Sequence, residues 1–139
     1  MSSLVISAAR AVAEMLNGET ISGETLSAVF RLVVERSIAS ARNLQVICVP
    51  HRFESSISGR GNAKERTVTV DVGLMKRCAE SELEHLVELT EAIGDYLEGK
   101  KISAGRCIGV NFSPIYDTDF FLQQSCFFSL ISVDIKVLV

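Results

Sequence analysis

The sequence predicts an α+β fold: a mixed, mostly antiparallel sheet of four to five strands with two main helices packed on one face. Residues 67–74 and 126–139 alternate apolar and polar side chains with a period of two, which is typical of strands buried on one side. Residues 4–16 and 79–97 place apolar side chains at the helical spacing of three and four. The 139 residues, 47% of them hydrophobic, are enough for a single domain covering residues 1–139.

The C-terminal stretch CFFSLISVDIKVLV, residues 126–139, organises the predicted sheet. Every second side chain, on one face of the strand, is apolar apart from Ser129, and the side chains between them are mixed. The strand therefore buries only one of its faces. An unpaired strand of this composition would invite aggregation. We therefore expect it to lie between or beside strands from earlier in the chain.

The first helix, residues 4–16, has recognisable ends. Ser2 or Ser3 can cap its start, and Asn17 and Gly18 both accept the left-handed conformation that ends a helix. Its polar face is not basic, so we expect it to cover the sheet rather than lie on a membrane surface.

The second helix, residues 79–97, carries apolar side chains along one side and acidic ones along the other. Ser81 offers an N-cap with Glu84 three residues on. Gly99 marks its end, where Lys100 and Lys101 complement the negative end of the helix dipole.

The remaining strands follow from β-branched runs and from breakers. We expect strands over residues 29–38, 44–50 and 102–115, with Pro50 ending the second because proline cannot donate to a ladder. Asp117 can cap a single helical turn that reaches residue 124. The predicted core packs the two helices on the alternating strands: Val5, Val12, Leu16, Leu83, Leu86, Val87 and Ile93 on Val68, Val70, Val72, Ile131, Val133 and Ile135.

The charge balance excludes some classes of partner. The net charge of −3 argues against a general affinity for nucleic-acid phosphates, which requires a concentrated basic surface. No apolar run approaches the ~20 residues needed to span a bilayer, and the N-terminus lacks the basic flank and apolar core of a signal peptide. We expect a cytoplasmic protein with no membrane contact.

The chain has four widely spaced cysteines: Cys48, Cys78, Cys107 and Cys126. They form no CxxC motif and no Cys/His pair at zinc spacing, so we expect reduced, buried thiols and no metal or cofactor. An enzyme would use Cys48 with His51 as nucleophile and base. The other such pair is Cys78 with His85, but neither stands in a recognisable motif, and we do not expect an enzyme.

The longest stretch without periodicity is HRFESSISGRGNAKE, residues 51–65. It reads as an exposed connection between strands, and its length exceeds the two to five residues of a hairpin turn. Such a loop is either a connector or a binding element. If it binds, its cations form one half of the predicted interface: Arg52, Arg60, Lys64 and Arg66. The acidic side of the second helix is a candidate for the other half: Glu80, Glu84, Glu88 and Glu91.

The order helix, two strands, loop, strand, helix, strand, turn, strand resembles the tail terminator family of long-tailed bacteriophages. The likeness rests on ISAARAVAEML, LQVICVP, TVTVDVGLMKR with SELEHLVELTEAIGDYL, and NFSPIY followed by FFSLISVDIKVLV. These pieces cover most of the chain and include no catalytic signature. The stretches 58–64 and 117–125 fall outside the likeness.

The resemblance implies a structural virion protein of the tail or neck, assembled in the host cytoplasm as a hexameric ring. Such a ring caps the tail tube, stops its elongation and provides the docking face for the head connector. Its implied partners are further copies of the chain, the tail tube protein and the head connector or stopper protein. DNA only passes through the lumen, which an acidic protein suits because carboxylates repel phosphate. No cofactor is implied.

Two other functions stay open on the sequence. A head–tail connector or stopper protein of the neck shares the logic of a ring. A small-ligand or regulatory binding module would use the open face of the sheet. A closed ring elutes at several times the mass of one chain, whereas a binding module or an enzyme is expected as a monomer or dimer.

Overall fold

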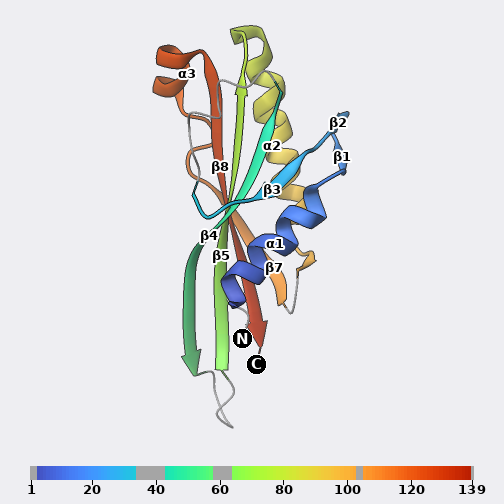
Figure 1. The fold of residues 1–139 in the computed structure, drawn as a ribbon, viewed down its shortest axis with the longest axis vertical. Helices are drawn as coiled ribbons and strands as arrows, with labels where there is room; N and C mark the ends of the chain where they lie inside the picture. Colours follow the sequence, from blue (N-terminus) through green and yellow to red (C-terminus); the bar gives the residue numbers. More distant parts are fainter. Residues whose placement is uncertain (1–2, 34–42, 58–63, 103–104, 139) are drawn as a thin grey trace.

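The computed structural model describes residues 3–33, 43–57, 64–102 and 105–138, with the backbone alone at residues 56, 57, 64 and 138. This part of the chain has an α+β fold with a curled, mixed six-stranded sheet, a two-stranded sheet and three α-helices (Figure 1). The predicted class is confirmed, but the expected four to five strands are too few, because short strands pair at both edges of the large sheet. The elements in chain order are α1 (Leu4–Leu16), β1 (Thr20–Ile21), β2 (Glu24–Thr25), β3 (Ala28–Phe30), β4 (Gln45–Ile57), β5 (Lys64–Arg77), the 3-10 turn η2 (Glu80–Glu82), α2 (Leu83–Leu97), β6 (Lys101–Ile102), β7 (Gly105–Phe112), α3 (Thr118–Gln124) and β8 (Cys126–Leu138).

The large sheet has the strand order β3-β4-β5-β8-β7-β6. Its neighbours are antiparallel except for β3, which pairs parallel with β4. The C-terminal strand β8 lies between β5 and β7, which confirms that it pairs within the sheet. Its register with β5 is unbroken from Glu65↔Leu138 to Arg77↔Cys126.

The helix-covered face of the sheet, called the inner face below, holds the main core. Alternate residues of β5 and β8 point into it with no exposed surface, as the period of two predicts: Val68, Val70, Val72, Leu74, Phe127, Ile131, Val133 and Ile135. The two main helices add side chains that are at most 2% exposed: Ala9, Val12, Leu16, Leu86, Leu89, Ile93 and Leu97. The predicted core is confirmed, although Val5, Leu83 and Val87 are only half-buried at its border. Burying each large side chain stabilises the fold by about 1.5–3 kcal/mol before entropy is counted.

Helix α1 begins and ends where the sequence predicts. The Ser3 hydroxyl accepts a hydrogen bond from the Ile6 N–H at 3.3 Å, which caps the first turn. Asn17 leaves the helix with an extended backbone, and Gly18 follows with φ of +85°. Only glycine adopts that conformation without a steric penalty, so Gly18 turns the chain back toward the sheet.

Helix α2 ends as predicted but begins differently. Gly99, with φ of +79°, follows its last turn. Ser81 is not the cap, because it lies inside the preceding 3-10 turn, and no side chain caps the helix. The Leu83 N–H donates to the Glu80 carbonyl instead, so the backbone of the turn supplies the missing partner.

The short strands depart from the prediction. β3 has three residues and not the ten of 29–38, and positions 34–38 of that stretch lie outside the described residues. The polar link over residues 19–26 contains a tight β1–β2 hairpin, in which Ser22 and Gly23 have φ of 51° and 81°. Two successive left-handed residues are what a two-residue hairpin turn requires. The predicted strand 102–115 is divided into β6 and β7.

Pro50 does not end its strand, because β4 continues through it to Ile57. The Cys48 carbonyl accepts from the Arg31 N–H, so Cys48 points its backbone groups toward β3. The backbone groups of Pro50, two residues on, point to the same side of the strand as those of Cys48. The N–H that proline lacks would therefore face away from β5, and the ladder with β5 loses no hydrogen bond there. An irregularity between Pro50 and Arg52 then shifts the register, and pairing with β5 resumes.

The other face of the sheet, called the outer face below, is covered at one end by α3, which is the helix that the described residues place there. The Asp117 side chain accepts from the Phe120 N–H at 3.0 Å and caps α3, as predicted. α3 packs beside β8, where Phe120 meets the Phe128 ring edge-on at a centroid distance of 6.0 Å. A second apolar cluster forms there: Ile47, Val49, Met75, Cys126 and Phe128.

Candidate functional site

The predicted binding loop over residues 51–65 is mostly strand. β4 and β5 pair from Gln45↔Met75 to Ile57↔Lys64, so only residues 58–63 connect them. The sequence hides this strand because the alternation of apolar and polar side chains in β4 is broken at Pro50. The hydrogen-bonded pairing with β5 nevertheless continues past that point. The hairpin extends beyond α1 at the lower end of the molecule (Figure 1). The expectation of a long exposed loop is therefore wrong for these residues.

Of the four predicted cations, the structure describes the side chains of Arg52 and Arg66. Arg52 lies on the outer face, where its Nη1 is 3.6 Å from Glu54 Oε1, both side chains being largely exposed. Arg66 lies on the inner face, opposite Val137 of β8. Lys64 begins β5 with its side chain not described, and Arg60 lies outside the described residues.

Arg66 is the distinctive member of the set. Its Nε is buried and has no hydrogen-bond partner among the described residues. Its guanidinium carbon is 5.9 Å from the ring centroid of Phe53, a large apolar side chain that remains 45% exposed. Buried donors are nearly always paired in isolated folded proteins. This end of the inner face therefore combines an exposed aromatic ring with a cation whose Nε has no hydrogen-bond partner among the described residues.

The predicted acidic half forms a row on α2. Glu84, Glu88 and Glu91 are exposed at spacings of four and three residues, and Asp95 extends the row. No cation of the described residues forms an ion pair with these four carboxylates. Like charges at this spacing destabilise a helix, so the row does not serve the stability of α2. Glu80, on the 3-10 turn η2, is also exposed but precedes the helix.

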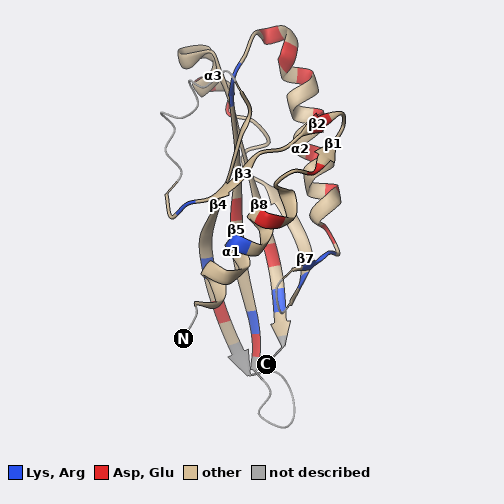
Figure 2. Cartoon of the chain, turned by 45° about the vertical axis from the view of Figure 1, so that its right-hand side comes forward, with Lys and Arg blue, Asp and Glu red and all other residues tan. Residues whose placement is uncertain are grey.

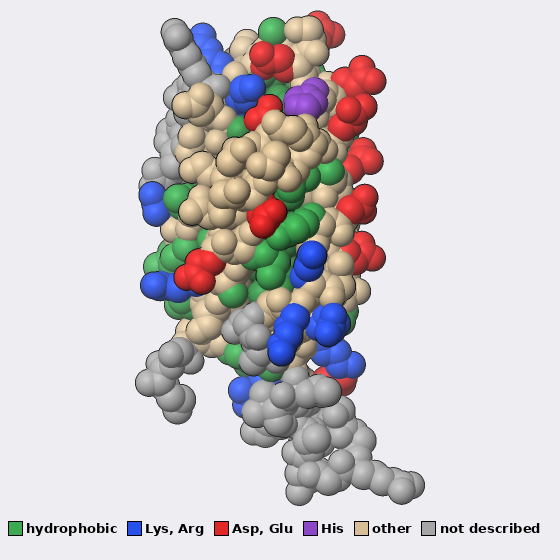
Figure 3. All heavy atoms as spheres, turned by 90° about the vertical axis from the view of Figure 1, so that its right-hand side faces the viewer, with side chains coloured by type: hydrophobic (Ala, Val, Ile, Leu, Met, Phe, Trp, Pro, Cys, Tyr) green, Lys and Arg blue, Asp and Glu red, His purple; other side chains and the backbone are tan. Residues whose placement is uncertain are grey.

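Charge is distributed unevenly over the molecule. Acidic residues recur along α2 in the upper half, while the lower ends of the long strands carry Lys and Arg residues together with some acidic ones (Figure 2). In the space-filling view the acidic side chains form a column along one border, with basic ones gathered beneath it (Figure 3). The acidic row and the β4–β5 hairpin thus lie at different ends of one molecule, and the structure does not bring the two halves of the predicted interface together.

A polar network on the outer face was not predicted. His51 Nδ1 lies 2.5 Å from Asp71 Oδ2, and the Ser132 hydroxyl donates to Asp71 Oδ1 at 3.0 Å. Beside it, the Thr69 hydroxyl donates to Asp134 Oδ1 at 2.7 Å. These residues come from β4, β5 and β8. The alternation places Asp71 and Thr69 on one parity, but which side chains lie opposite them depends on a strand register that the sequence does not show.

This network does not have the order of a nucleophilic triad. In a triad the imidazole lies between the nucleophile and the carboxylate, so that it can take the proton of the hydroxyl. Here Asp71 lies between His51 and Ser132, and both groups contact the same carboxylate. The arrangement holds three strands together and leaves Ser132 without a base in the network.

The cysteine–histidine pairs do not form nucleophile–base sites either. Cys48 lies in the inner-face core and His51 contacts Asp71 on the outer face, so the sheet separates them. Burial raises the pKa of the Cys48 thiol to about 12, which keeps it protonated at neutral pH. Burial also raises the pKa of Cys78, and His85 lies beside Glu24, with 3.5 Å between Nε2 and Oε1. All four thiols are free.

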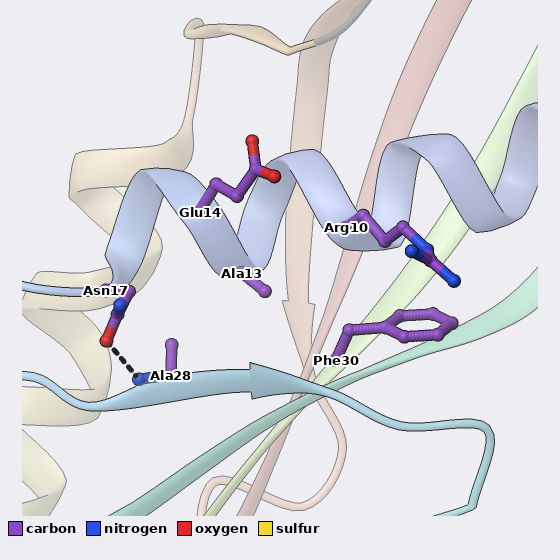
Figure 4. A pocket seen from close by; sticks show the side chains of 6 residues that line it. All are labelled: Arg10, Ala13, Glu14, Asn17, Ala28 and Phe30. Carbon is purple, nitrogen blue, oxygen red and sulfur yellow. Dashed lines mark hydrogen bonds between the residues drawn. The ribbon is translucent and has the colours of Figure 1, made fainter.

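A groove of about 280 Å³ lies between α1 and β3 (Figure 4). Arg10 places its guanidinium carbon 4.8 Å from the Phe30 ring centroid, and the Asn17 side chain accepts from the Ala28 N–H at 3.2 Å. Glu14 points away from Phe30 toward solvent (Figure 4). Ligand pockets are usually larger, concave and mostly apolar, so this groove fits a small molecule poorly.

Two negative findings concern the described residues as a whole. None of the helices in the described part of the chain has the length and apolar composition needed to cross a bilayer. Within the same residues, no group of three His, Cys, Asp or Glu side chains is arranged to hold a metal ion.

Comparison with known proteins does not add a relative. A scan of protein-family models found no match, and the search of curated proteins found none.

Proposed function

We propose that this chain is a structural subunit of a closed ring of the bacteriophage tail terminator type. The ring, a hexamer by the resemblance, caps the tail tube, stops its elongation and offers a docking face to the head connector or stopper protein. DNA passes through the lumen without being bound, which the net charge of −3 favours because it repels phosphate. The chain acts as a virion component and not as an enzyme.

The observation that carries this proposal is the separation of opposite charges on one chain. A closing ring needs heterologous contacts, in which one patch of each subunit meets a different patch of its neighbour. The carboxylates of Glu84, Glu88 and Glu91 lack cationic partners among the described residues, and Arg66 at the far end forms no ion pair with a described carboxylate. Two unsatisfied, complementary surfaces that cannot meet within one copy can meet between copies.

A head–tail connector or stopper protein is the second candidate, because it would use the same ring contacts. The two functions differ in the partner that the ring binds first. A ligand-binding module has less support, since the groove between α1 and β3 is small and partly polar.

The test begins with the assembly state of the purified chain. We expect light scattering to give several times the mass of one chain and negative-stain images to show closed rings. High salt should dissociate them, because it screens exposed charges. Added to polymerising tail tube protein, the chain should shorten the tubes; binding to the connector without an effect on tube length would favour the connector function.

A matched pair of variants separates the acidic row from general charge. Glu84→Gln with Glu88→Gln should weaken ring formation and tube capping. Glu14→Gln with Asp119→Asn removes the same charge from exposed sites on α1 and α3 and should have no effect. A chain that stays monomeric at low salt, alone and with tube protein, would contradict the proposal.

A further inference from the structure

We infer that Phe53 and Arg66 anchor each subunit to the next one, docking on α2 of a second copy of this chain at Glu88 and its apolar neighbours. The inference rests on the proposed ring and specifies its contact. It replaces the expected exposed loop with a preformed strand surface as the binding element.

The anchor is preformed because both residues lie on paired strands. Phe53 of β4 is opposite Val68 of β5, so the ring and the guanidinium project from adjacent strands on the inner face. The Arg66 guanidinium carbon lies 5.9 Å from the centroid of the Phe53 ring, and Phe53 is 45% exposed. Aromatic and arginine side chains are the residue types that dominate binding energy at protein interfaces.

The border beside the anchor is also open. β3 pairs with β4 only over Val46 to Cys48, so in the described chain no strand flanks β4 on that side at Phe53. Figure 1 shows the hairpin extending past α1, which covers the inner face higher up. A partner can therefore approach Phe53 without displacing any helix or strand that the structure describes in the same copy.

The α2 surface supplies what the anchor lacks. Glu84, Glu88 and Glu91 offer carboxylates, and a carboxylate can accept charge-assisted hydrogen bonds from an arginine guanidinium such as that of Arg66. Val87 and Ala92 flank the acidic row on its two sides and are half-buried. Ala92 lies one turn after Glu88, so the Phe53 ring can pack against this small apolar side chain beside the carboxylate.

The helix α2 that binds Phe53 and Arg66 has to belong to a second copy of the chain and not to the same copy. Figures 1 and 2 place α2 along the upper half of the molecule and the hairpin at its lower end. A head-to-tail contact between different patches follows, which is the type of contact that closes into a ring.

The first experiment is a charge reversal with rescue. Arg66→Glu should reduce association between copies by at least about tenfold, because it places a carboxylate against the acidic row. Adding Glu88→Arg to the same chain should restore much of the loss. Arg77→Glu changes the net charge equally on the same strand, in an exposed position at its other end, and should leave association unchanged.

Glu88→Arg alone tests the contact if Arg66→Glu fails to fold, because Glu88 is exposed on α2. It should weaken association while leaving the circular dichroism spectrum and the melting temperature unchanged. Association at wild-type strength in Glu88→Arg, or no rescue in the double variant, would overturn the inference.

A photo-crosslinker identifies the occupant directly. With p-benzoylphenylalanine in place of Phe53, irradiated assemblies should give crosslinked dimers whose joined peptide contains residues 83–97 of the other copy. Rings whose crosslinks map to another region would refute this contact and leave the proposed function standing. Absence of any assembly, with or without tube protein, would refute the proposed function itself.

Discussion

The two faces of the same strands are organised by different forces. On the inner face, alternate residues of β5 and β8 such as Val70 and Val133 are fully buried under the helices. On the outer face, the central residues between them are polar, and side-chain hydrogen bonds such as Ser132 to Asp71 link one strand to the next. Hydrophobic burial therefore stabilises the whole inner face, whereas on the outer face it is confined to the end under α3 and hydrogen bonding organises the centre.

The outer face is also buried in part without a helix over it. Thr69 and Asp71 are only 4% and 8% exposed, because neighbouring side chains of β4 and β8 cover them. A buried carboxylate is tolerated only when its hydrogen bonds are made. The outer face therefore has a specific arrangement, although it contributes less apolar burial than the inner one.

The largest expected effect breaks the inner face. Val133→Asp places a carboxylate among fully buried apolar side chains, which should cost about 3 kcal/mol or more and prevent soluble expression. Asn111→Asp, on the exposed outer side of the neighbouring strand β7, is the control and should change the free energy of unfolding by less than about 0.5 kcal/mol. A normal thermal melt of Val133→Asp would contradict the assignment of the faces.

Two glycines of β7 compare the faces with the same substitution. A Cβ on Gly105, on the inner side, would lie 2.5 Å from the Lys136 carbonyl oxygen, whereas a Cβ on Gly109, on the outer side, meets nothing within 4 Å. Gly105→Ala should therefore destabilise the fold by about 1–3 kcal/mol. Gly109→Ala should be neutral or slightly stabilising in chemical denaturation. Equal effects would mean that β7 moves freely against β8.

Removing the centre of the polar network tests the outer face. Asp71→Ala leaves the Ser132 hydroxyl and His51 without their acceptor and should lower the free energy of unfolding by about 1–2 kcal/mol. His51→Ala removes a single, half-exposed partner and should cost less. If both variants melt like the wild type, the network does not contribute to stability.

The smallest effect concerns pH. Burial raises the folded-state pKa of Cys48 from the ordinary thiol value of 9.0 to about 12, so the folded state holds its proton more tightly. The contribution of the protonated Cys48 thiol to the free energy of unfolding is complete below pH 9 and is lost as the pH rises from 9 toward 12. At pH 9 the loss is ~0.4 kcal/mol. Cys48→Ala should flatten this part of the stability–pH curve. In the native state at pH 8, a thiol reagent should modify half-buried Cys78 before Cys48; the reverse order would contradict the inner-face burial of Cys48.

The sequence by itself determined the elements whose signal is local. Helices α1 and α2, strands β5 and β8, the Ser3 and Asp117 caps and nearly all of the core follow from periodicity and cap chemistry, because each depends on residues a few positions apart. The acidic row on α2 belongs to this group, since helical spacing alone places its members on one face. The tail terminator function remains a prediction.

The tertiary structure decided everything that depends on pairing between distant residues. β4 continues past Pro50 because the missing N–H faces the edge of the sheet, which only the position of β3 reveals. Asp71 meets His51 and Ser132 because of the strand register, and Arg66 meets Phe53 for the same reason. These contacts join residues 13 to 61 positions apart in the chain, and no local periodicity specifies which distant side chains a sheet will place side by side.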